Sequence, residues 1–306
     1  MRRPGRATYS VRYLPSLQGR TPMEQAYFFI RDVPLAIMPI RGQKDRPDFG
    51  VSIDPADDEV AAWLAGFIHI GQFEHQRLDE AVVEFVETAA RYLAYSGEIY
   101  FEMVFADDAE RPSRLVALPP GPVVRLPTKY LQVVPKADRS ALEGHRYFAI
   151  PSRQMWRLRL PPEMGSTRQH RRMLSKLERL SGVMPPFAVH SGDLGHSAKF
   201  DFAAHHRACE LGVERATNRW GTIPSLAQIE GTTEYFFLAR RLAWQRSQAI
   251  LREHILTELN VLLVRLRVPH RVIVAGLPTA PEILDALRKL HAGEIDIAAA
   301  MAVGRI

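Results

Sequence analysis

The chain has 306 residues, of which 46% are hydrophobic and 24% charged, a composition typical of a folded protein rather than a disordered one. Its net charge of +6 and pI near 9.6 favour a polyanionic partner such as nucleic acid without requiring one. The single cysteine, Cys209, excludes an internal disulfide, and the apolar runs are too short for a membrane span.

The first 50 residues are expected to form a basic arm followed by peripheral strands. Arginines and prolines alternate up to Pro22, which disfavours regular structure. Two short extended pieces are then expected at Tyr27 to Ile30 and at Val33 to Ile40, because Pro34 and Pro39 interrupt this stretch.

Two helices and then several short strands are expected between residues 51 and 160. The first helix starts at the acidic residues 57–59 and runs to about His69, and the second runs from Leu78 to Tyr95. Apolar residues alternate from Ile99 to Phe105, which predicts a half-buried strand. Further strands, separated by prolines, are expected at Arg114 to Leu118, Val123 to Leu126, Lys129 to Val134, Arg146 to Ile150 and Met155 to Leu160.

Residues 161–231 are expected to hold two helices and a loop. The first helix, from Ser166 to Leu180, is strongly basic, and its simplest interpretation is a solvated face. Its basic residues are Arg168, His170, Arg171, Arg172, Lys176 and Arg179. The second helix runs from about Phe202 to Trp220 and leads into a loop bracketed by Gly221, Pro224 and Gly231.

A very long helix is expected from Thr232 to Leu266, because this stretch contains neither proline nor glycine. At 1.5 Å per residue it would span roughly 50 Å. Its apolar residues repeat every seven positions, at Tyr235, Leu242, Ala249, Leu256 and Leu263. A polar waist interrupts this seam, formed by residues 245–248 together with Arg240, Arg241 and Arg252.

Two interpretations of this helix stay open on sequence alone. It is either one long core helix with a solvated face, or a spoke of a symmetric assembly whose basic waist faces a polyanion. Beyond it, the pattern predicts a strand from Arg271 to Ala275 and helices from Pro281 to Leu290 and from Asp296 to Val303. The fold class predicted from these elements is α+β, mainly helical.

The sequence lacks the phosphate-loop, dinucleotide, nucleophile-elbow and zincin motifs, so no catalytic centre and no cofactor are expected. Potential metal ligands gather at His190, His196, His205 and His206, with Asp193 and Asp201. Their spacing matches no closed metal site, and no metal is predicted. Cys209 lies on an expected helix without a neighbouring base, so it is not expected to act as a nucleophile.

Three stretches of the chain carry patterns that follow one another in a fixed order. In the run from Leu93 to Leu126 the pattern consists of Gly97, Tyr100, Glu102, Leu118 and Pro119, and it resembles the passage from a helix to a strand in the portal proteins of tailed bacteriophages. The segment from Phe202 to Leu263 is similar to the stem helix, tunnel loop and long tunnel helix of that family, in the same order. The segment from Ile283 to Asp296 is similar to its closing helix and turn.

The resemblance implies a structural protein rather than an enzyme. Portal proteins form rings of roughly twelve copies at a capsid vertex, with a channel for packaging and ejecting DNA. The implied partners are double-stranded DNA bound without sequence recognition, the major capsid protein, terminase and a head-tail adaptor. The implied location is the virion, after assembly in the host cytoplasm.

The family's arrangement also divides the chain. It implies a wing over 51–160, stem helices and tunnel loop over 161–231, a tunnel helix over 232–268 and a wing or crown segment over 269–306. The clip would lie either within 112–160 or at 183–200. Residues expected in the DNA channel are Arg246 and Arg252. Residues expected at the subunit interface are Arg240, Arg241, Leu242, Leu256 and Leu263.

Two other functions remain open at this stage. The basic composition also fits a nucleic-acid-binding protein that acts as a monomer or dimer. The histidine-rich segment from His190 to His206 would suit an unrecognised metal-dependent hydrolase.

Overall fold

The structure is a computed structural model of the whole chain. It describes residues 24–40, 42–70, 77–105, 111–118, 123–134, 136, 139, 144–181, 202–221 and 233–303. The α-helices are α1 (Glu24–Asp32), α2 (Asp58–Phe67), α3 (Leu78–Ser96), α4 (Thr167–Ser181), α6 (Phe202–Thr217), α7 (Glu234–Arg265), α8 (Ala280–Ala292) and α9 (Ile297–Val303). The strands are β1 (Gly50–Asp54), β2 (Glu98–Phe105), β3 (Pro112–Leu118), β4 (Val123–Arg125), β5 (Lys129–Val133), β6 (Tyr147–Pro151), β7 (Met155–Arg159) and β8 (Arg271–Ala275).

Helix predominates over strand, so the predicted mixed and mainly helical class is confirmed. None of the helices in the described ranges is long and apolar enough to cross a membrane.

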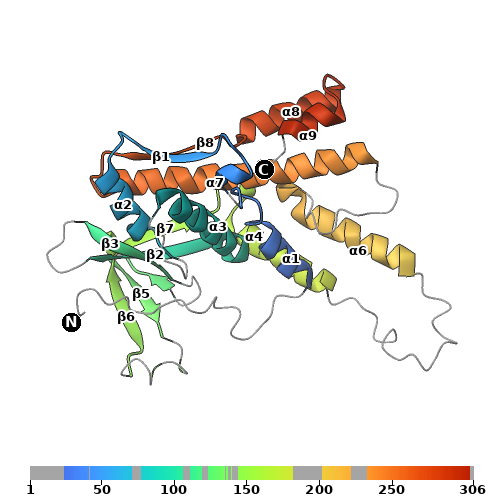
Figure 1. Cartoon of the computed structure of the whole chain (residues 1–306). Helices are drawn as coiled ribbons and strands as arrows, with labels where there is room; N and C mark the ends of the chain where they lie inside the picture. Colours follow the sequence, from blue (N-terminus) through green and yellow to red (C-terminus); the bar gives the residue numbers. More distant parts are fainter. Residues whose placement is uncertain are drawn as a thin grey trace.

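Helix α7 runs the length of the molecule (Figure 1), and α3, α8, α9, β7 and β8 pack along it. Its 32 residues span about 48 Å. It begins at Thr233, whose side chain accepts a hydrogen bond from the Phe236 amide, and it ends within a residue or two of the position predicted from the sequence. The absence of proline and glycine therefore identified this helix correctly.

The strands form antiparallel sheets of the order β3-β2-β7, β4-β5-β6 and β1-β8. Strand β2 lies in the middle of the first sheet and is buried on both faces, so the half-buried strand predicted from its alternation is wrong. Ile99, Phe101 and Met103 face the main core, whereas Tyr100 packs with Tyr130 against the second sheet. The second sheet covers the face that the sequence pattern assigns to solvent.

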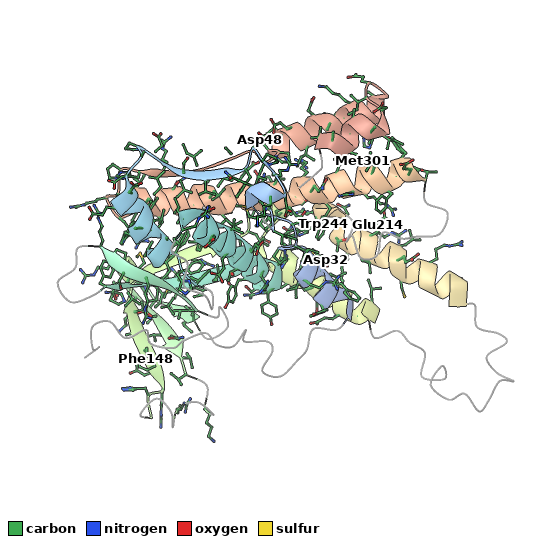
Figure 2. All side chains as sticks on the ribbon, in the orientation of Figure 1. Asp32, Asp48, Phe148, Glu214, Trp244 and Met301 are labelled. Atoms are coloured by element: carbon green, nitrogen blue, oxygen red, sulfur yellow. The ribbon has the colours of Figure 1, made fainter. Side chains whose placement is uncertain are left out.

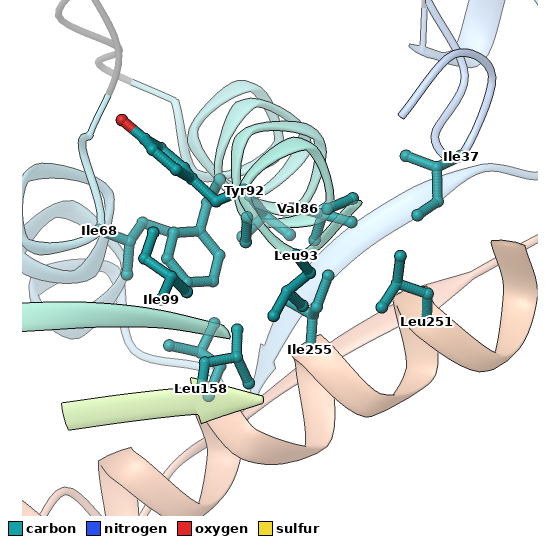
Figure 3. Close-up of a cluster of buried hydrophobic side chains, with 14 of the residues drawn as sticks. Ile37, Ile68, Val86, Tyr92, Leu93, Ile99, Leu158, Leu251 and Ile255 are labelled. Atoms are coloured by element: carbon teal, nitrogen blue, oxygen red, sulfur yellow. The ribbon is translucent and has the colours of Figure 1, made fainter. Parts of the chain in front are cut away.

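The main core lies where α3, β2, β7 and α7 meet (Figure 3). Val86 and Leu93 of α3 pack with Leu158 of β7 and with Leu251 and Ile255 of α7, all fully or almost fully buried. Each such side chain contributes roughly 1.5–3 kcal/mol through removal of its apolar surface from water.

The N-terminal strands expected at 27–40 are wrong. Residues 24–32 form α1 instead, because Ala26, Phe29 and Val33 are spaced so that one helical face enters the core. The prolines at 34 and 39 fall in the turns after this helix. Strand β1, which was not predicted from the sequence, pairs with the expected strand β8 in the register Val51 to Val274.

The first 50 residues and the four segments implied by the family resemblance share one core. The main cluster draws Ala26, Leu93, Leu177, Leu251 and Val272 from the five successive segments. Within the described residues, these divisions therefore correspond to parts of one packed body rather than to separately folded units.

Candidate nucleic-acid interface

The polar waist of α7 faces the inside of the protein. Gln245, Ser247 and Gln248 are all buried. The Gln248 amide donates hydrogen bonds to the Asp32, Val33 and Leu35 carbonyls at 3.4, 3.0 and 2.7 Å. The turns after α1 leave these carbonyls without strand or helix partners, so an internal donor satisfies them.

Arg252 belongs to the same buried group, and its expected place in a DNA channel is wrong. Only 3% of its surface is exposed. Its guanidinium donates to the Ile37 carbonyl at 3.4 Å and to the Pro278 carbonyl at 2.5 Å. Burial lowers the pKa of Arg252 to about 10, which still leaves it charged at neutral pH. A cation enclosed in this way cannot contact a phosphate, and it holds two loops against α7 instead.

Arg246 is half-buried, and its Nε atom is buried without a hydrogen-bond partner among the described residues. The structure does not bring Arg246 and Arg252 together on an open surface. A channel role for Arg246 stays a prediction.

Most of the residues expected at the subunit interface are already paired or buried within the protomer. Arg240 pairs with Glu214 of α6 at 2.8 Å, which removes the need for an acid from a neighbour. Leu242 and Leu263 are fully buried in the protomer's own clusters, so their assignment to an interface is wrong. Helices α8 and α9 cover Leu242, and the main core covers Leu263. Leu256 is half-buried against the main core, and Arg241 is exposed.

Gly221 ends the short 3-10 helix Asn218–Trp220 and passes very close to α7. Its φ is +80°, and a Cβ at this position would lie 2.5 Å from the Trp244 nitrogen. Only glycine fits this approach. The remainder of the expected tunnel loop, with Pro224 and Gly231, lies outside the described residues.

One face of α4 is both exposed and strongly basic. We call it the α4 basic face, and it consists of the exposed residues Arg168, Arg171, Arg172, Lys176 and Arg179. Counted from Arg168, the other four residues lie three, four, eight and eleven positions further along the chain. On an α-helix all five then fall within an arc of about 140° and span about 16 Å of helix length. The other exposed residue inside this arc is the neutral Ser175. The acid nearest to this arc, Glu178, is half-buried and lies about 20° beyond the Arg171 edge, so the exposed side chains within the arc are basic or neutral.

The opposite face of α4 anchors the helix. Met173 and Leu177 enter the main core, and His170 is buried beneath them against Phe29 and Trp220. The Nε2 atom of His170 lies 2.7 Å from the Ala94 carbonyl, an arrangement that suits a neutral imidazole donating from Nε2. Burial lowers the pKa of His170 from 6.5 to about 4. The sequence-based placement of His170 on the basic surface is therefore wrong.

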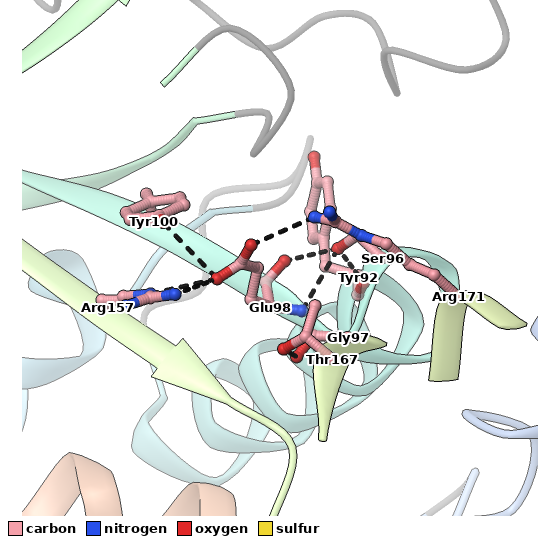
Figure 4. A network of polar contacts seen from close by, with 8 residues as sticks. All are labelled: Tyr92, Ser96, Gly97, Glu98, Tyr100, Arg157, Thr167 and Arg171. Carbon is pink, nitrogen blue, oxygen red and sulfur yellow. Dashed lines mark hydrogen bonds and ion pairs between the residues drawn. The ribbon is translucent and has the colours of Figure 1, made fainter. Parts of the chain in front are cut away.

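A buried carboxylate ties the N-terminal end of α4 to the sheet (Figure 4). Glu98, the first residue of β2, accepts from Arg157 of β7 at 2.5 Å and from Arg171 of α4 at 3.2 Å. The Tyr100 hydroxyl donates to the same carboxylate at 3.4 Å. Because Glu98 is almost fully buried, these partners must neutralise it. Arg171 therefore holds α4 in place, while the remaining basic residues of the face are left to solvent.

Helix α6 packs beside α4 at very short range. A Cβ added to Gly212 would lie 2.8 Å from a Leu180 methyl group. Arg219, just beyond α6, donates to the Gln169 side chain of α4 at 3.3 Å. The two helices thus form a close pair next to Gly221, which approaches α7. Arg215 of α6 is a further exposed basic residue on this pair.

The basic residues of α4 were evident in the sequence, but their helical spacing is the signal that identifies a single face. The contact between Glu98 and Arg157 was not predicted, because no local pattern reveals a pair separated by 59 positions.

Metal ligands do not gather in the described part of the chain, where no group of three or more His, Cys, Asp or Glu side chains could hold an ion. The segment from His190 to His196, with Asp193 and Asp201, lies outside the described residues, as do the side chains of His205 and His206. Cys209 is half-buried on α6 and takes part in no disulfide.

No known protein-family model matches this chain. Among curated proteins, none matches it either.

Proposed function

We propose that this protein is a portal-like ring protein of a tailed phage, in which about twelve copies surround a channel for double-stranded DNA. In this role it would sit at a capsid vertex of the virion and dock terminase, a head-tail adaptor and the major capsid protein. It would contribute no catalysis of its own.

The α4 basic face is the observation that carries the proposal. DNA that slides must be held by phosphate-directed contacts that are individually weak. Exposed arginine and lysine side chains without interspersed acids supply such contacts, and α4 presents them along about 16 Å. This assignment replaces the buried Arg252 as the DNA-facing element.

The order of the elements gives further support. A helix that ends at Gly97 leads into β2 with Tyr100 and Glu102, as in the portal resemblance. In this proposal the α4 and α6 pair would correspond to the stem helices, and α7, which Gly221 approaches closely at Trp244, would correspond to the tunnel helix. The clip would lie either within 112–160 or at 183–200, and the second of these segments lies outside the described residues.

Mass photometry and DNA binding at several salt concentrations test the proposal together. Wild-type protein is expected to form rings. Replacing Arg172, Lys176 and Arg179 with alanine should leave the rings intact, because these residues are exposed and form no ion pair within the described ranges. The slope of log affinity against log salt should fall by about one unit for each phosphate that the variant no longer neutralises.

Two controls sharpen this experiment. Arg288 of α8 is also exposed, and its replacement with alanine should leave DNA binding almost unchanged. Arg171 is kept, because it holds Glu98. A protein that remains monomeric at every concentration would refute the ring, and an unchanged salt slope in the triple variant would refute the DNA role of α4.

A nucleic-acid-binding protein acting as a monomer or dimer is the second candidate, because the α4 basic face does not itself require a ring. Native mass separates the two functions. A monomer that loses DNA affinity in the triple variant would support this second candidate.

A further inference from the structure

Helices α4 and α6 lie side by side and run in opposite directions. Gly212 of α6 packs against Leu180 near the end of α4, and Arg219, just beyond α6, donates to Gln169 near the start of α4. Arg215 lies between Gly212 and Arg219 in the sequence, so it is level with the middle of α4. The antiparallel register therefore brings Arg215 beside the α4 basic face.

The two helices present Lys176 and Arg215 on the same side of the pair. On α4, Lys176 lies about 100° round the helix from Leu177, which enters the main core. On α6, Arg215 lies about 160° from Val213, which also enters the main core. Both cations are therefore on the outer side of the pair, away from the core.

These two cations are also turned toward the neighbouring helix. Lys176 comes two turns after Gln169 and lies about 20° from its direction, which is the direction of Arg219. Arg215 lies about 60° from Gly212, where a Cβ would meet a Leu180 methyl group at 2.8 Å. Since glycine lets the two backbones approach closely, cations from both helices can reach one phosphate.

The exposed surface of this helix pair is basic throughout. The exposed residues of α4 are the five of its basic face with Gln169 and Ser175, and those described on α6 are Ala204, Arg207, Ala208, Leu211 and Arg215. None of these exposed residues is an acid. Glu214 of α6, marked in Figure 2, is half-buried and pairs with Arg240 of α7 at 2.8 Å. We call Arg172, Lys176 and Arg215 the α4–α6 strip, and they form no ion pair with any described residue.

Phosphate is the ligand chemistry that fits this strip, because unpaired cations attract a polyanion. No aromatic ring is among the exposed residues described on the two helices, so bases have nothing to stack on. Each helix with its side chains is about 10–12 Å across, so the pair is too wide to enter a major groove of about 12 Å and read base edges. Leu211 is the only large apolar side chain among these residues, which is too little to insert into a lipid surface.

We propose that the α4–α6 strip binds the sugar–phosphate backbone of one DNA strand, with Arg215 as the contact that α6 supplies. This inference rests on the proposed function and specifies how DNA meets the α4 basic face. Arg172 and Lys176 approach the backbone from α4, and Arg215 approaches it from α6. Because one strand is contacted, a single strand and a duplex present the same ligand to the strip.

The salt dependence of DNA binding by the full-length protein tests the strip. Arg215→Ala should reduce the slope of log affinity against log salt by about 0.9 unit with duplex DNA and by about 0.7 unit with a single strand, the values for one phosphate. Arg215→Lys keeps the charge and should retain the wild-type slope. Inorganic polyphosphate, which has no bases, should displace both forms of DNA.

Arg207→Ala is the matched control. Arg207 is exposed on the same helix, but it lies about 80° round from Arg215 and about 12 Å away along α6, near the C-terminal end of α4. Its removal should leave the slope almost unchanged. Thermal unfolding of all three variants should match wild type, since both arginines are exposed and form no ion pair within the described ranges.

The outcomes separate the strip from the α4 basic face and from the ring. If Arg215→Ala and Arg207→Ala change the slope equally, the strip is refuted, whereas the α4 basic face stands or falls with the triple variant. If Arg215→Ala loses slope but wild type is monomeric, the ring is refuted and the strip stands.

Three further results would overturn the ligand assignment. A loss of slope with duplex DNA alone refutes contact with one strand. Failure of polyphosphate to displace DNA refutes a contact made through phosphate. Binding of wild type to vesicles of anionic lipid in preference to DNA would assign the strip to a membrane surface instead.

Discussion

Polar side chains in the middle of α7 satisfy backbone groups that helices and strands leave unpaired elsewhere. Gln248 and Arg252 donate to carbonyls of the 32–37 turn and of Pro278. Asn260 accepts from and donates to the Val272 backbone, as a neighbouring strand would. Leaving such carbonyls unpaired would cost about 1–3 kcal/mol each, so these polar residues stabilise the fold.

His170 should make the protein sensitive to mild acid. The pKa of this buried imidazole is about 4 in the folded protein, below its ordinary 6.5. Between these values the unfolded chain binds a proton that the folded chain does not, so the free energy of unfolding falls as pH falls from about 6.5 to about 4. The loss attributable to His170 is about 3 kcal/mol.

The variant His170→Gln isolates this effect, because an amide can still donate to the Ala94 carbonyl but does not titrate near neutrality. Urea unfolding at pH 7.5 and pH 4.5 should show a smaller acid loss in the variant than in wild type. Equal losses in the two proteins would show that His170 does not govern the acid response.

Among the elements, the helices were predicted well because their signals are local. The pair Thr279 and Glu282 forms a capping box at the start of α8, and α3 ends at Gly97 in the left-handed conformation. The strands of 98–160 were found because prolines separate them. The segment 27–40 was predicted incorrectly because Pro34 and Pro39 suggested extended structure, whereas the helical spacing of Ala26, Phe29 and Val33 decides it.

The candidate site was only partly predictable. Sequence reasoning assigned the arginines of α7 to a surface, because charged residues are rarely buried. Arg252 is an exception, because the carbonyls that it binds belong to loops distant in the sequence. Ile37 lies more than 200 residues away, and Pro278 lies 26 residues away. The α4 basic face could be predicted from the sequence, since helical geometry alone places its five basic residues within one arc.

Gly221 should be essential to the junction between the short 3-10 helix and α7. Alanine there would meet the Trp244 backbone at 2.5 Å and would also have to adopt a φ of +80°. Thermal unfolding of Gly221→Ala should show a loss of more than about 2 kcal/mol. Gly293→Ala is the matched control, because Gly293 has a φ of +70° but no atom within 4 Å of the added Cβ.

The control should lose only about 1 kcal/mol, the cost of the left-handed conformation alone. If both variants lose the same free energy, close packing of the junction against α7 is not what requires glycine at position 221.

At the scale of the whole molecule, α7 connects two cores of different size. Its C-terminal half contributes Leu251, Ile255 and Leu259 to the main cluster. Its N-terminal half contributes Leu238 and Leu242 to a smaller cluster with α8 and α9. The two clusters overlap at the polar waist, since Trp244 before it belongs to the main cluster and Ala249 after it to the smaller one. The interruption seen in the sequence therefore lies where the two clusters meet.

Hydrogen exchange should therefore divide this one helix into two parts. In the dissociated protomer, amides of 251–263 should exchange only through global unfolding, because the main core must open to expose them. Amides of 238–242 should exchange at least about tenfold faster, through an opening that detaches α8 and α9 and spares the main core. The variant Leu290→Ala removes a buried side chain from the smaller cluster alone. It should accelerate exchange in 238–242 and in α8 while leaving 251–263 unchanged. Equal acceleration along all of α7 would mean that the two clusters unfold as a single unit.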